Sequence, residues 1–277
     1  MNVLFVCSGN TCRSPMAEGY LKSLNLPGVF VKSAGVAVGS FSGVNPNSVA
    51  VMAEIGINIS GHYPTQITKT AIDWADEIIC MNSSHKNAIL SVESGKNISV
   101  LGGGIFDPYG SGVSVYRECL DQIINEIDLK FLGVGVIRAK KSHIADIAKL
   151  EKICFSEPWS ENAITEAINN GTEIFVAIKN NTFAGYAGIN CVLDEGYVTN
   201  IAVTPEFRRQ GVAQKLINKL NFLAKQNSLA FITLEVRCSN NSAIQLYTKN
   251  GYTREGVRKG FYNNPKEDAV IMTKRFL

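Results

Sequence analysis

The sequence has no apolar run long enough to cross a membrane and no N-terminal pattern typical of a signal peptide. A membrane-spanning helix needs about 20 mostly apolar residues, so an integral membrane protein is not expected. The seven cysteines lie within otherwise apolar segments and form no spaced framework, which argues against a disulfide-stabilised secreted fold. No internal repeat or low-complexity tract is present either. We therefore expect a cytoplasmic protein that has no membrane partner.

The sequence also lacks a large excess of either charge, because its formal net charge is only +3. We expect no direct nucleic-acid partner. The charge is unevenly distributed, with eight Lys and Arg against eleven Asp and Glu in residues 1–132, and nineteen against thirteen in residues 133–277. A chain of 277 residues is long enough for two domains, each able to bury a core. The two halves are therefore expected to face different partners.

Apolar patterns in the first half alternate between strand-like and helix-like segments. Strands are predicted at 2–6 and 76–81, and helices at 15–24, 47–56, 66–73 and 113–128. This alternation favours an α/β architecture, a parallel sheet with helices on both faces in three layers. Gly133 and Gly135 then interrupt an apolar stretch that begins a new strand. We place the boundary between an N-terminal domain, residues 1–132, and a C-terminal domain, residues 133–277, with hardly any linker.

One short loop of the first half concentrates reactive residues. The string VCSGNTCRSP places Cys7, Cys12, Arg13 and Ser14 between the first strand and the following helix. Backbone N–H groups of such a loop form a nest that binds phosphate. Arg13 can grip two phosphate oxygens with its planar guanidinium. The pKa of a thiol in such an electropositive site falls from about 8.5 to roughly 4–7, so we expect Cys7 to be a thiolate nucleophile.

Three further residues fit this chemistry. Ser14 can donate a hydrogen bond to the Cys7 thiolate, and Asn10 is a residue type that tolerates a left-handed turn. The leaving group needs a proton donor, and the stretch IFDPYGSG supplies Asp107. Asp107 would protonate the leaving atom and then take a proton from the water that hydrolyses the phosphocysteine. A lone cysteine is often a core residue and Asp-Pro often a turn, but C-x5-R-S with a distant D-P-Y indicates a catalytic site.

With V-C-S-G-N-T-C-R-S-P and D-P-Y, residues 1–130 resemble the low-molecular-weight protein phosphatases along their whole length. This family needs no metal. The resemblance implies that Cys7 is the nucleophile, Arg13 the phosphate clamp and Asp107 the general acid, and that His62 orients Asn10. Taken alone, His62 would be read as a surface histidine. The resemblance also implies that the loop binds the substrate, through Ser8, Gly9, Asn10, Thr11, Cys12 and Ser14.

Position 11 lines the mouth of the pocket in this family, so its side chain affects the choice of substrate. Tyrosine-selective members usually carry a bulky apolar residue there, whereas this chain has Thr11. Thr11, together with D-P-Y-G-S-G in place of a second aromatic after the tyrosine, resembles the bacterial protein-arginine phosphatases. Phosphoarginine is long and polar, and a hydroxyl can hydrogen-bond where a large aliphatic side chain would exclude it. Because threonine is also simply small, phosphotyrosine remains the alternative.

A second loop that leads into a helix lies in the other half. The string YVTNIAV (197–203) reads as a strand and is followed by TPEF, by RRQGVA and by a helix with Val212, Leu216 and Leu220 on one face. The pattern R-x-x-G-x-A, from Arg208 to Ala213, can wrap a pyrophosphate with backbone N–H groups. The pattern is weak alone. The downstream string LEVRCSNNSAIQLYTKNGY strengthens it and makes this half similar to the GNAT acetyltransferases.

Acetyl transfer to an amine needs a base for the incoming ammonium and an acid for the departing thiolate. On the strand FITLEVR, Glu235 alternates with Leu234 and Val236 and is expected to point away from the core, where it could be the base. Tyr247, on the following helix, is the candidate acid, and Asn240 could hold the cofactor arm. Taken singly, these residues could equally be a solvated Glu, a core Tyr and a helix-capping Asn.

Residues 135–277 resemble the ribosomal-protein-alanine N-acetyltransferases of the RimI type, through EPWSENAI, NIAVTPEFRRQGVA, LEVRCSNNSAIQLY and EDAVIM. The resemblance implies a mixed-sheet GNAT domain, acetyl-CoA as co-substrate, Glu235 as base, Tyr247 as acid and an N-terminal alanine as acceptor. Trp159 and Tyr262 could border the acceptor cleft, but each would sooner be read as a packing residue. The residues expected to bind acetyl-CoA are Ile201, Ala202, Val203, Arg208, Arg209, Gln210, Gly211, Val212, Ala213, Gln214 and Asn240.

The sequence therefore predicts a bifunctional enzyme. One half would dephosphorylate proteins at phosphoarginine or phosphotyrosine, and the other would acetylate the N-terminus of a ribosomal protein. In a different reading, one half is a silent binding module that localises the other, or the acetyltransferase has another amine specificity. The intact reactive residues of both halves argue against silence.

Overall fold

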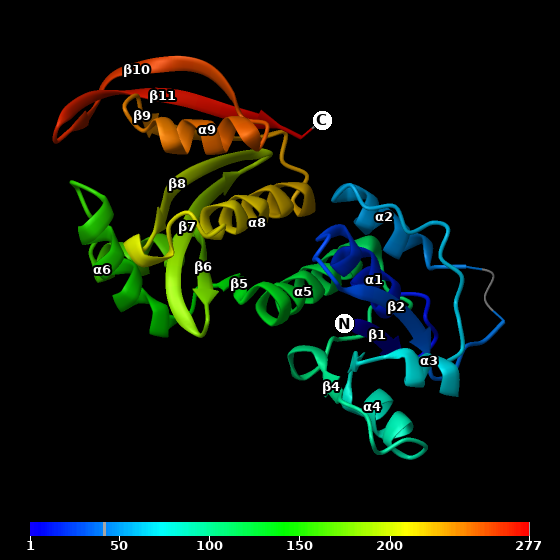
Figure 1. Ribbon diagram of the computed structural model, residues 1–277. Coiled ribbons are helices and arrows are strands. Elements are labelled where there is room, and N and C mark those ends of the chain that lie inside the picture. The colour runs from blue at the N-terminus through cyan, green and yellow to red at the C-terminus, as the bar shows by residue number, and fades with distance from the viewer. Residues whose placement is uncertain (41–42, 277) are drawn as a thin grey trace. The chain divides into compact units, whose positions relative to one another are not determined.

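The computed structural model describes residues 1–40 and 43–276 (Figure 1). The chain divides into two compact units, Met1–Leu132 and Gly133–Leu277. Within the described residues, no helix is both long enough and apolar enough to cross a membrane.

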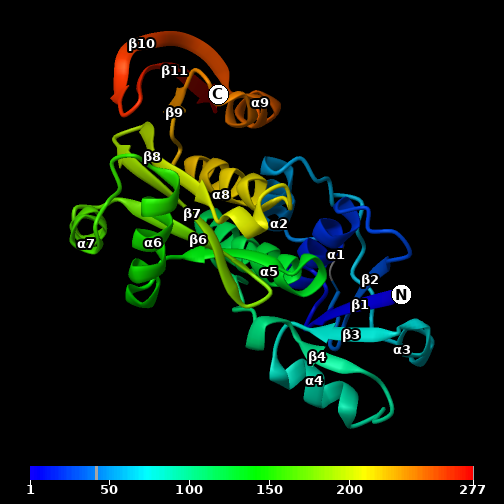
Figure 2. The same cartoon turned by 60° about the vertical axis from the view of Figure 1, so that its left-hand side comes forward.

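The first unit is built on a four-stranded parallel sheet in the order β2-β1-β3-β4 (Figure 2). Its strands are β1 (Asn2–Cys7), β2 (Phe30–Gly35), β3 (Glu77–Cys80) and β4 (Ile98–Val100). Its helices are α1 (Arg13–Ser23), α2 (Pro46–Glu54), α3 (Lys69–Trp74), α4 (Ser83–Leu90), the 3-10 turn η1 (Leu101–Gly103) and α5 (Val113–Leu132).

Helices cover both faces of this sheet because its central strand β1 is apolar on both sides. Leu4 and Val6 pack in one core cluster with Ile72 of α3 and Ile89 of α4. Side chains alternate along a strand, so the neighbouring positions face the other side, where α1 and α5 pack. The predicted three-layer arrangement with a parallel sheet is confirmed. It places the carboxyl end of β1, at Cys7, directly before the N-terminus of α1.

The second unit is built on a seven-stranded mixed sheet in the order β10-β11-β9-β8-β7-β6-β5 (Figure 2). Its strands are β5 (Val134–Arg138), β6 (Glu173–Lys179), β7 (Thr182–Val192), β8 (Glu195–Val203), β9 (Phe231–Arg237), β10 (Thr253–Asn263) and β11 (Lys266–Arg275). Its helices are η2 (Lys141–His143), α6 (Ile144–Cys154), α7 (Glu161–Asn169), η3 (Pro205–Phe207), α8 (Val212–Gln226) and α9 (Asn241–Lys249).

Apolar periodicity explains how this sheet is covered. The buried face of α8 carries Val212, Leu216 and Leu220, as predicted from their helical spacing. A separate core cluster joins α6 and α7 to β6, β7 and β8. Figure 2 shows α8 and α6 on opposite faces of the sheet. The predicted mixed sheet is confirmed, since β8 and β9 pair in parallel and the other neighbours pair antiparallel.

Candidate active sites

The first candidate site is the loop that joins β1 to α1. Asn10 adopts φ +54°, the left-handed conformation expected of it, and its backbone N–H donates to Cys7 Sγ at 3.3 Å. Ser14 Oγ lies 3.0 Å from the same sulfur. Gly35 of the adjacent strand lies against this loop, because a Cβ there would come within 2.6 Å of the Ser8 carbonyl oxygen. The loop therefore curls around Cys7 and directs hydrogen-bond donors at its sulfur.

The side chain of Asn10 anchors this turn. Its Nδ2 donates to Ser14 Oγ at 2.9 Å and to Ser33 Oγ at 2.8 Å. Its Oδ1 accepts from the Thr65 backbone N–H at 2.8 Å and lies 3.0 Å from His62 Nε2. These four contacts use the full capacity of the amide, so its orientation is fixed and His62 Nε2 must be the donor. Because Asn10 already donates to Ser14 Oγ, the hydroxyl proton of Ser14 is available to the sulfur.

His62 was predicted to orient Asn10, and the structure places the two side chains in contact. Its Nδ1 lies 3.6 Å from Glu18 Oε2. Burial lowers the pKa of His62, and the nearby Glu18 carboxylate opposes this decrease. A neutral imidazole with its proton on Nε2 can donate to the Asn10 oxygen, so the contact does not require a charged histidine.

Arg13 and Asp107 meet at the mouth of the loop. Arg13 Nη2 forms an ion pair with Asp107 Oδ2, and Nη1 donates to the Ile105 carbonyl oxygen at 3.2 Å. The side chain of Arg13 is 4% exposed and that of Asp107 is 48% exposed. The Arg13 Nε is buried and lacks a hydrogen-bond partner within residues 1–40 and 43–276. A buried guanidinium N–H without an acceptor is costly, so this group is suited to an anionic ligand.

A cavity of about 250 Å³ opens at this point. It is lined by Cys7, Ser8, Gly9, Thr11, Cys12, Arg13, Ala37, Asp107 and Tyr109. Seven of these nine residues were predicted as site residues. The structure therefore brings the nucleophile candidate, the cation and the acid candidate to one hollow of the surface.

Cys12 sits on the inner side of the loop, with only 4% of its surface exposed. Its Sγ lies 3.3 Å from the Tyr116 hydroxyl and 3.5 Å from Thr11 Oγ1. Burial raises the pKa of Cys12, and these two hydrogen bonds partly oppose the increase. Cys12 is therefore a protonated thiol at neutral pH.

His85 is a neighbour of the loop that sequence patterns did not indicate. It is 3% exposed, and its Nε2 lies 2.8 Å from Ser8 Oγ. Burial lowers the pKa of His85 to about 4, Arg13 adds to the decrease and Asp107 opposes it. Its Nδ1 is buried without a partner in the described part of the chain. Ser8 and His85 are 77 positions apart, so no local spacing could have revealed this contact.

The second candidate site begins where β8 and β9 separate. The two strands pair over only three positions, from Glu195↔Phe231 to Tyr197↔Thr233. Beyond this, β8 continues to pair with β7 as far as Val203, and β9 with β11 as far as Arg237. The predicted residues Ile201, Ala202 and Val203 therefore lie on the diverging part of β8, where their backbone is not paired with β9. An extended ligand arm could bind along such an edge.

The loop from Arg208 to Gly211 joins this part of β8 to α8. Arg209 has φ +59° and Gly211 has φ +81°. A Cβ at Gly211 would meet nothing within 4 Å. Glycine is therefore favoured here by the positive φ and not by a shortage of space. Two left-handed residues at a helix N-terminus form the nest geometry expected of an anion site. The Arg208 side chain turns back and donates to the Val203 carbonyl oxygen at 3.1 Å.

The remaining predicted residues lie in the loop before α8 and in the first turn of α8. Val212 is buried, and Ala213 follows it in the first turn. Gln210 Nε2 donates to the Glu206 carbonyl oxygen at 2.7 Å. Gln214 Nε2 donates to Asn250 Oδ1 at 2.5 Å, so its side chain faces the end of α9. The Gln210 and Gln214 side chains therefore have protein partners.

Glu235 points away from the core, as predicted from alternation along β9. Its Oε1 forms an ion pair with Arg258 Nη1 at 3.0 Å. Its carbonyl oxygen accepts from the Tyr262 hydroxyl at 3.2 Å. The carboxylate is 29% exposed and therefore accessible to an incoming cation.

Tyr247 and Asn240 lie on and before α9. Tyr247 is 8% exposed, and burial raises its pKa, so its hydroxyl is protonated at neutral pH. Asn240 caps α9, because its Oδ1 accepts from the Ala243 backbone N–H at 3.1 Å. The capping alternative for Asn240 is therefore the interaction observed.

Two aromatic residues were expected to border an acceptor. Trp159 packs against the core cluster of α6 and α7, and its backbone N–H donates to Glu151 Oε2 at 2.7 Å. Tyr262 touches Glu235 through its hydroxyl, and its ring lies 4.2 Å from the guanidinium carbon of Arg237.

Sequence patterns missed Glu151 and Arg237. A charged residue at an apolar position of the helix 144–154 was the available signal for Glu151.

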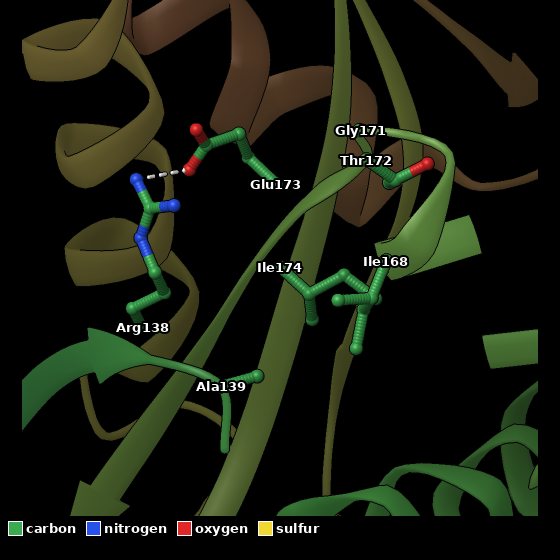
Figure 3. Close-up of a pocket in the computed structure, with 7 residues that line it drawn as sticks. All are labelled: Arg138, Ala139, Ile168, Gly171, Thr172, Glu173 and Ile174. Carbon is green, nitrogen blue, oxygen red and sulfur yellow. Dashed lines mark ion pairs between the residues drawn. The ribbon is translucent and has the colours of Figure 1, made fainter. Parts of the chain in front are cut away.

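A smaller cavity of about 150 Å³ lies at another edge of the second unit (Figure 3). It is lined by Arg138, Ala139, Ile168, Gly171, Thr172, Glu173 and Ile174. Arg138 Nη2 and Glu173 Oε2 form an ion pair at 2.6 Å, drawn as a dashed line in Figure 3. None of these seven residues was predicted as a site residue, and the hydroxyl of Thr172 donates to Asn190 Oδ1 at 2.6 Å.

Comparison with known proteins assigns each part of the chain. Residues 2–133 match the low molecular weight phosphotyrosine protein phosphatases, and residues 144–252 match the acetyltransferase (GNAT) family. The chain is 40% identical over 135 residues to a protein-arginine-phosphatase of Geobacillus stearothermophilus, covering 46% of this chain and 90% of the relative. It is 36% identical over 131 residues to a putative [ribosomal protein bS18]-alanine N-acetyltransferase of Bacillus subtilis (strain 168), covering 47% of this chain and 87% of the relative.

Among solved structures, the YwlE arginine phosphatase from Geobacillus stearothermophilus is 39% identical, with a TM-score of 0.44, over 46% of this chain and 88% of that chain. Both matched families are families of enzymes. The predicted fusion is therefore confirmed: the chain belongs to the low-molecular-weight phosphatase family in its N-terminal part and to the GNAT acetyltransferase family in its C-terminal part.

Proposed function

We propose that the chain is a bifunctional enzyme with one activity in each half. Residues 1–132 would form a cysteine-dependent protein phosphatase that prefers phosphoarginine, and residues 133–277 an acetyl-CoA-dependent N-α-acetyltransferase. The observation that supports the first activity best is the buried Arg13 Nε without a partner, in the cavity that Cys7 also lines. A phosphoryl oxygen is the acceptor that this N–H requires.

In the proposed phosphatase reaction, Arg13 exchanges the Asp107 carboxylate for phosphoryl oxygens when substrate binds. Loop backbone N–H groups hold the remaining oxygens. Cys7 then attacks phosphorus while Asp107, protonated, gives its proton to the leaving nitrogen or oxygen as the bond to phosphorus breaks. Asp107 next takes a proton from a water molecule whose oxygen attacks the phosphorus of the phosphocysteine; the S–P bond breaks, which releases phosphate and regenerates the thiolate. Ser14, at 3.0 Å from the sulfur, stabilises the thiolate as it departs.

The preference for phosphoarginine rests on Thr11, which lines the cavity. A hydroxyl there can accept a hydrogen bond from a guanidinium N–H, whereas a bulky apolar side chain would favour a flat aromatic ring. The relative at 40% identity is named a protein-arginine-phosphatase, which supports the same substrate. Phosphotyrosine is the alternative, supported by the family description of low molecular weight phosphotyrosine phosphatases.

In the proposed acetyltransferase, the diverging edge of β8 and the loop before α8 hold acetyl-CoA. The backbone of residues 201–203 pairs with the extended arm, and the nest at Arg209 and Gly211 receives the pyrophosphate. Glu235 takes a proton from the acceptor ammonium, either directly or through water. Tyr247 gives its proton to the departing thiolate, a role suited to a hydroxyl that burial keeps protonated.

We propose an N-terminal alanine of a ribosomal protein as acceptor, because relatives of this half are named [ribosomal protein bS18]-alanine N-acetyltransferases. The acceptor would approach Glu235 beside Trp159 and Tyr262. Phosphorylated proteins would be the partners of the other half. We also propose a cytoplasmic location, since a thiolate nucleophile requires a reduced Cys7.

Assays on the full chain test both activities. The wild type should hydrolyse phosphoarginine peptides and should transfer acetyl from acetyl-CoA to a peptide that begins with alanine. Both reactions should persist in EDTA, because no proposed step uses a metal. Cys7→Ser should abolish only the first activity and Glu235→Gln should reduce only the second, so each variant is the control for the other.

If one half acts only as a binding module, the wild type would lack the activity assigned to that half, and the substitution in that half would change no measured activity. Acetylation confined to internal lysines would show that the acceptor assignment is wrong.

A further inference from the structure

Arg237 makes a cluster of contacts two residues after Glu235. Residues two apart on a strand project from the same face, so both side chains stand on one side of β9. The Arg237 side chain is 24% exposed. Its Nη1 pairs with Glu267 Oε2 at 3.1 Å and donates to the Pro265 carbonyl oxygen at 3.0 Å. Its Nη2 donates to the Asn264 carbonyl oxygen at 2.9 Å. The guanidinium therefore holds the turn between β10 and β11 against β9.

The same guanidinium reaches a second segment. Its Nη2 donates to Ser156 Oγ at 3.3 Å, in the loop that follows α6. A second link joins the same two segments, because Asn263 Nδ2 donates to Glu157 Oε1 at 3.2 Å. Figure 1 shows the β10–β11 turn and α6 at the same end of the second unit. Arg237 thus connects a loop and a turn that are more than 100 positions apart in sequence.

Each connected segment contains or adjoins one of the two aromatic residues proposed to border the acceptor, Trp159 and Tyr262. Tyr262, just before the turn, donates its hydroxyl to the Glu235 carbonyl oxygen at 3.2 Å, and its ring lies 4.2 Å from the guanidinium carbon of Arg237. The loop after α6 contains Trp159, whose backbone N–H donates to the buried Glu151 carboxylate. Arg237 therefore binds the loop that carries Trp159 and the turn next to Tyr262, the two residues proposed to border the acceptor.

We propose that Arg237 is a positioning residue for the acetyl acceptor: it clamps the loop 155–160 to the turn 263–266 and so fixes the acceptor's approach to Glu235. The inference rests on the proposed acetyltransferase function. The reaction requires the acceptor amine to be held in the orientation from which it attacks the acetyl group. If the loop or the turn were mobile, the amine would occupy this orientation less often. A planar guanidinium with several N–H groups can bind four oxygens and stack on a ring at once, which a lysine ammonium cannot.

Three variants of the full chain test the clamp. Arg237→Gln removes all its charge-assisted contacts. Ser156→Ala combined with Asn263→Ala removes only the two links between loop and turn and leaves the Arg237–Glu267 pair in place. The matched control is Arg275→Gln, which breaks the Arg275–Glu255 ion pair on the same two strands, away from Glu235.

For Arg237→Gln we expect the KM for an alanine peptide to rise roughly tenfold, from the loss of charge-assisted hydrogen bonds. The kcat should change less than about twofold and the Kd for acetyl-CoA should stay the same, because the diverging β8 edge is untouched. The double variant should show the same pattern to a smaller extent. Arg275→Gln should show none of it. Hydrogen exchange without acceptor should speed up in residues 155–160 and 263–266 of the first two proteins only.

An unchanged acceptor KM in both Arg237→Gln and the double variant would overturn the inference, even if thermal stability falls. A parallel loss of acetyl-CoA affinity would also overturn it, because it would show a general structural role. A wild type that acetylates no peptide would refute the proposed function instead. The exchange measurement would then still decide whether Arg237 clamps the two segments.

Discussion

The buried imidazole of His85 should make the first unit unstable in mild acid. His85 lies against Ser8 Oγ, and its pKa of about 4 lies below the 6.5 of an exposed histidine because burial disfavours the charged ring. Arg13 adds to this decrease and Asp107 opposes it. Between these two pKa values the unfolded chain binds a proton that the folded chain does not. The contribution of neutral His85 to the free energy of unfolding is therefore fully present above pH 6.5 and is lost as the pH drops toward 4.

The size of the effect follows from the two pKa values. With 6.5 unfolded and about 4 folded, linkage predicts a loss of about 2 kcal/mol at pH 5 relative to pH 7. This is a large share of the stability of a typical domain. His85→Gln should not lose this amount, because glutamine can still hydrogen-bond Ser8 and does not titrate. His62 also has a lowered pKa, but it titrates in both proteins and cancels in the difference.

The chain offers a clean probe, since its two tryptophans fall one in each unit, at Trp74 and Trp159. In a Trp159→Phe background, fluorescence follows the first unit alone. Urea unfolding at pH 7 and pH 5 would give the free energy of unfolding with histidine and with glutamine at position 85. If the difference between the two proteins is the same at both pH values within about 0.5 kcal/mol, the buried neutral state assigned to His85 is wrong.

Three further predictions concern the reactions themselves. Thr11→Ile should reverse the substrate preference measured as kcat/KM, from phosphoarginine toward phosphotyrosine peptides, because an apolar side chain excludes the guanidinium. Tyr247→Phe should lower kcat for acetyl transfer by roughly ten- to a hundredfold with little change in acetyl-CoA affinity, since an acid acts only as the thiolate develops. Peroxide should inactivate the phosphatase reversibly by dithiothreitol in wild type and irreversibly in Cys12→Ser. In the wild type, oxidation of Cys7 to sulfenic acid would be followed by attack of the Cys12 sulfur, which forms a disulfide and releases water.

Each of these has a result that contradicts it. A wild-type preference for phosphotyrosine would refute the role of Thr11. Loss of acetyl-CoA binding in Tyr247→Phe would indicate a packing role for the ring. Equal recovery of phosphatase activity after peroxide with and without Cys12 would show that its thiol protects nothing, while acetyl transfer serves as the internal control in both proteins.

Elements with one strong local signal could be predicted from sequence. The run NVLFV predicted β1, and apolar spacing predicted α8 and its buried face, because burial of one stripe requires that period. Boundaries were less accurate: α1 begins at Arg13, two positions before the predicted start. Pro15 lies in its first turn, where a missing N–H costs nothing, so it does not mark where the helix begins.

Contacts between distant segments could not be predicted. The direction of Glu235 followed from alternation along one strand, a local property. By contrast, the capping role of Asn240 competed with a ligand role in the same residue type, and only the backbone of α9 decides which hydrogen bond forms. The pairs His85 with Ser8 and Arg237 with Ser156 depend on how separate elements dock, which no period of 2 or 3.6 encodes.

The short pairing between β8 and β9 has a mechanical consequence for the second unit. Its sheet consists of two arms, β5–β8 and β9–β11, and three residue pairs are the seam between their backbones. A ligand arm hydrogen-bonded along the open edge of β8 would add contacts between the two arms of the sheet. Acetyl-CoA bound as proposed would then stabilise the sheet as well as supply the acetyl group, and its release would leave the arm that bears Glu235 freer to move when the product departs.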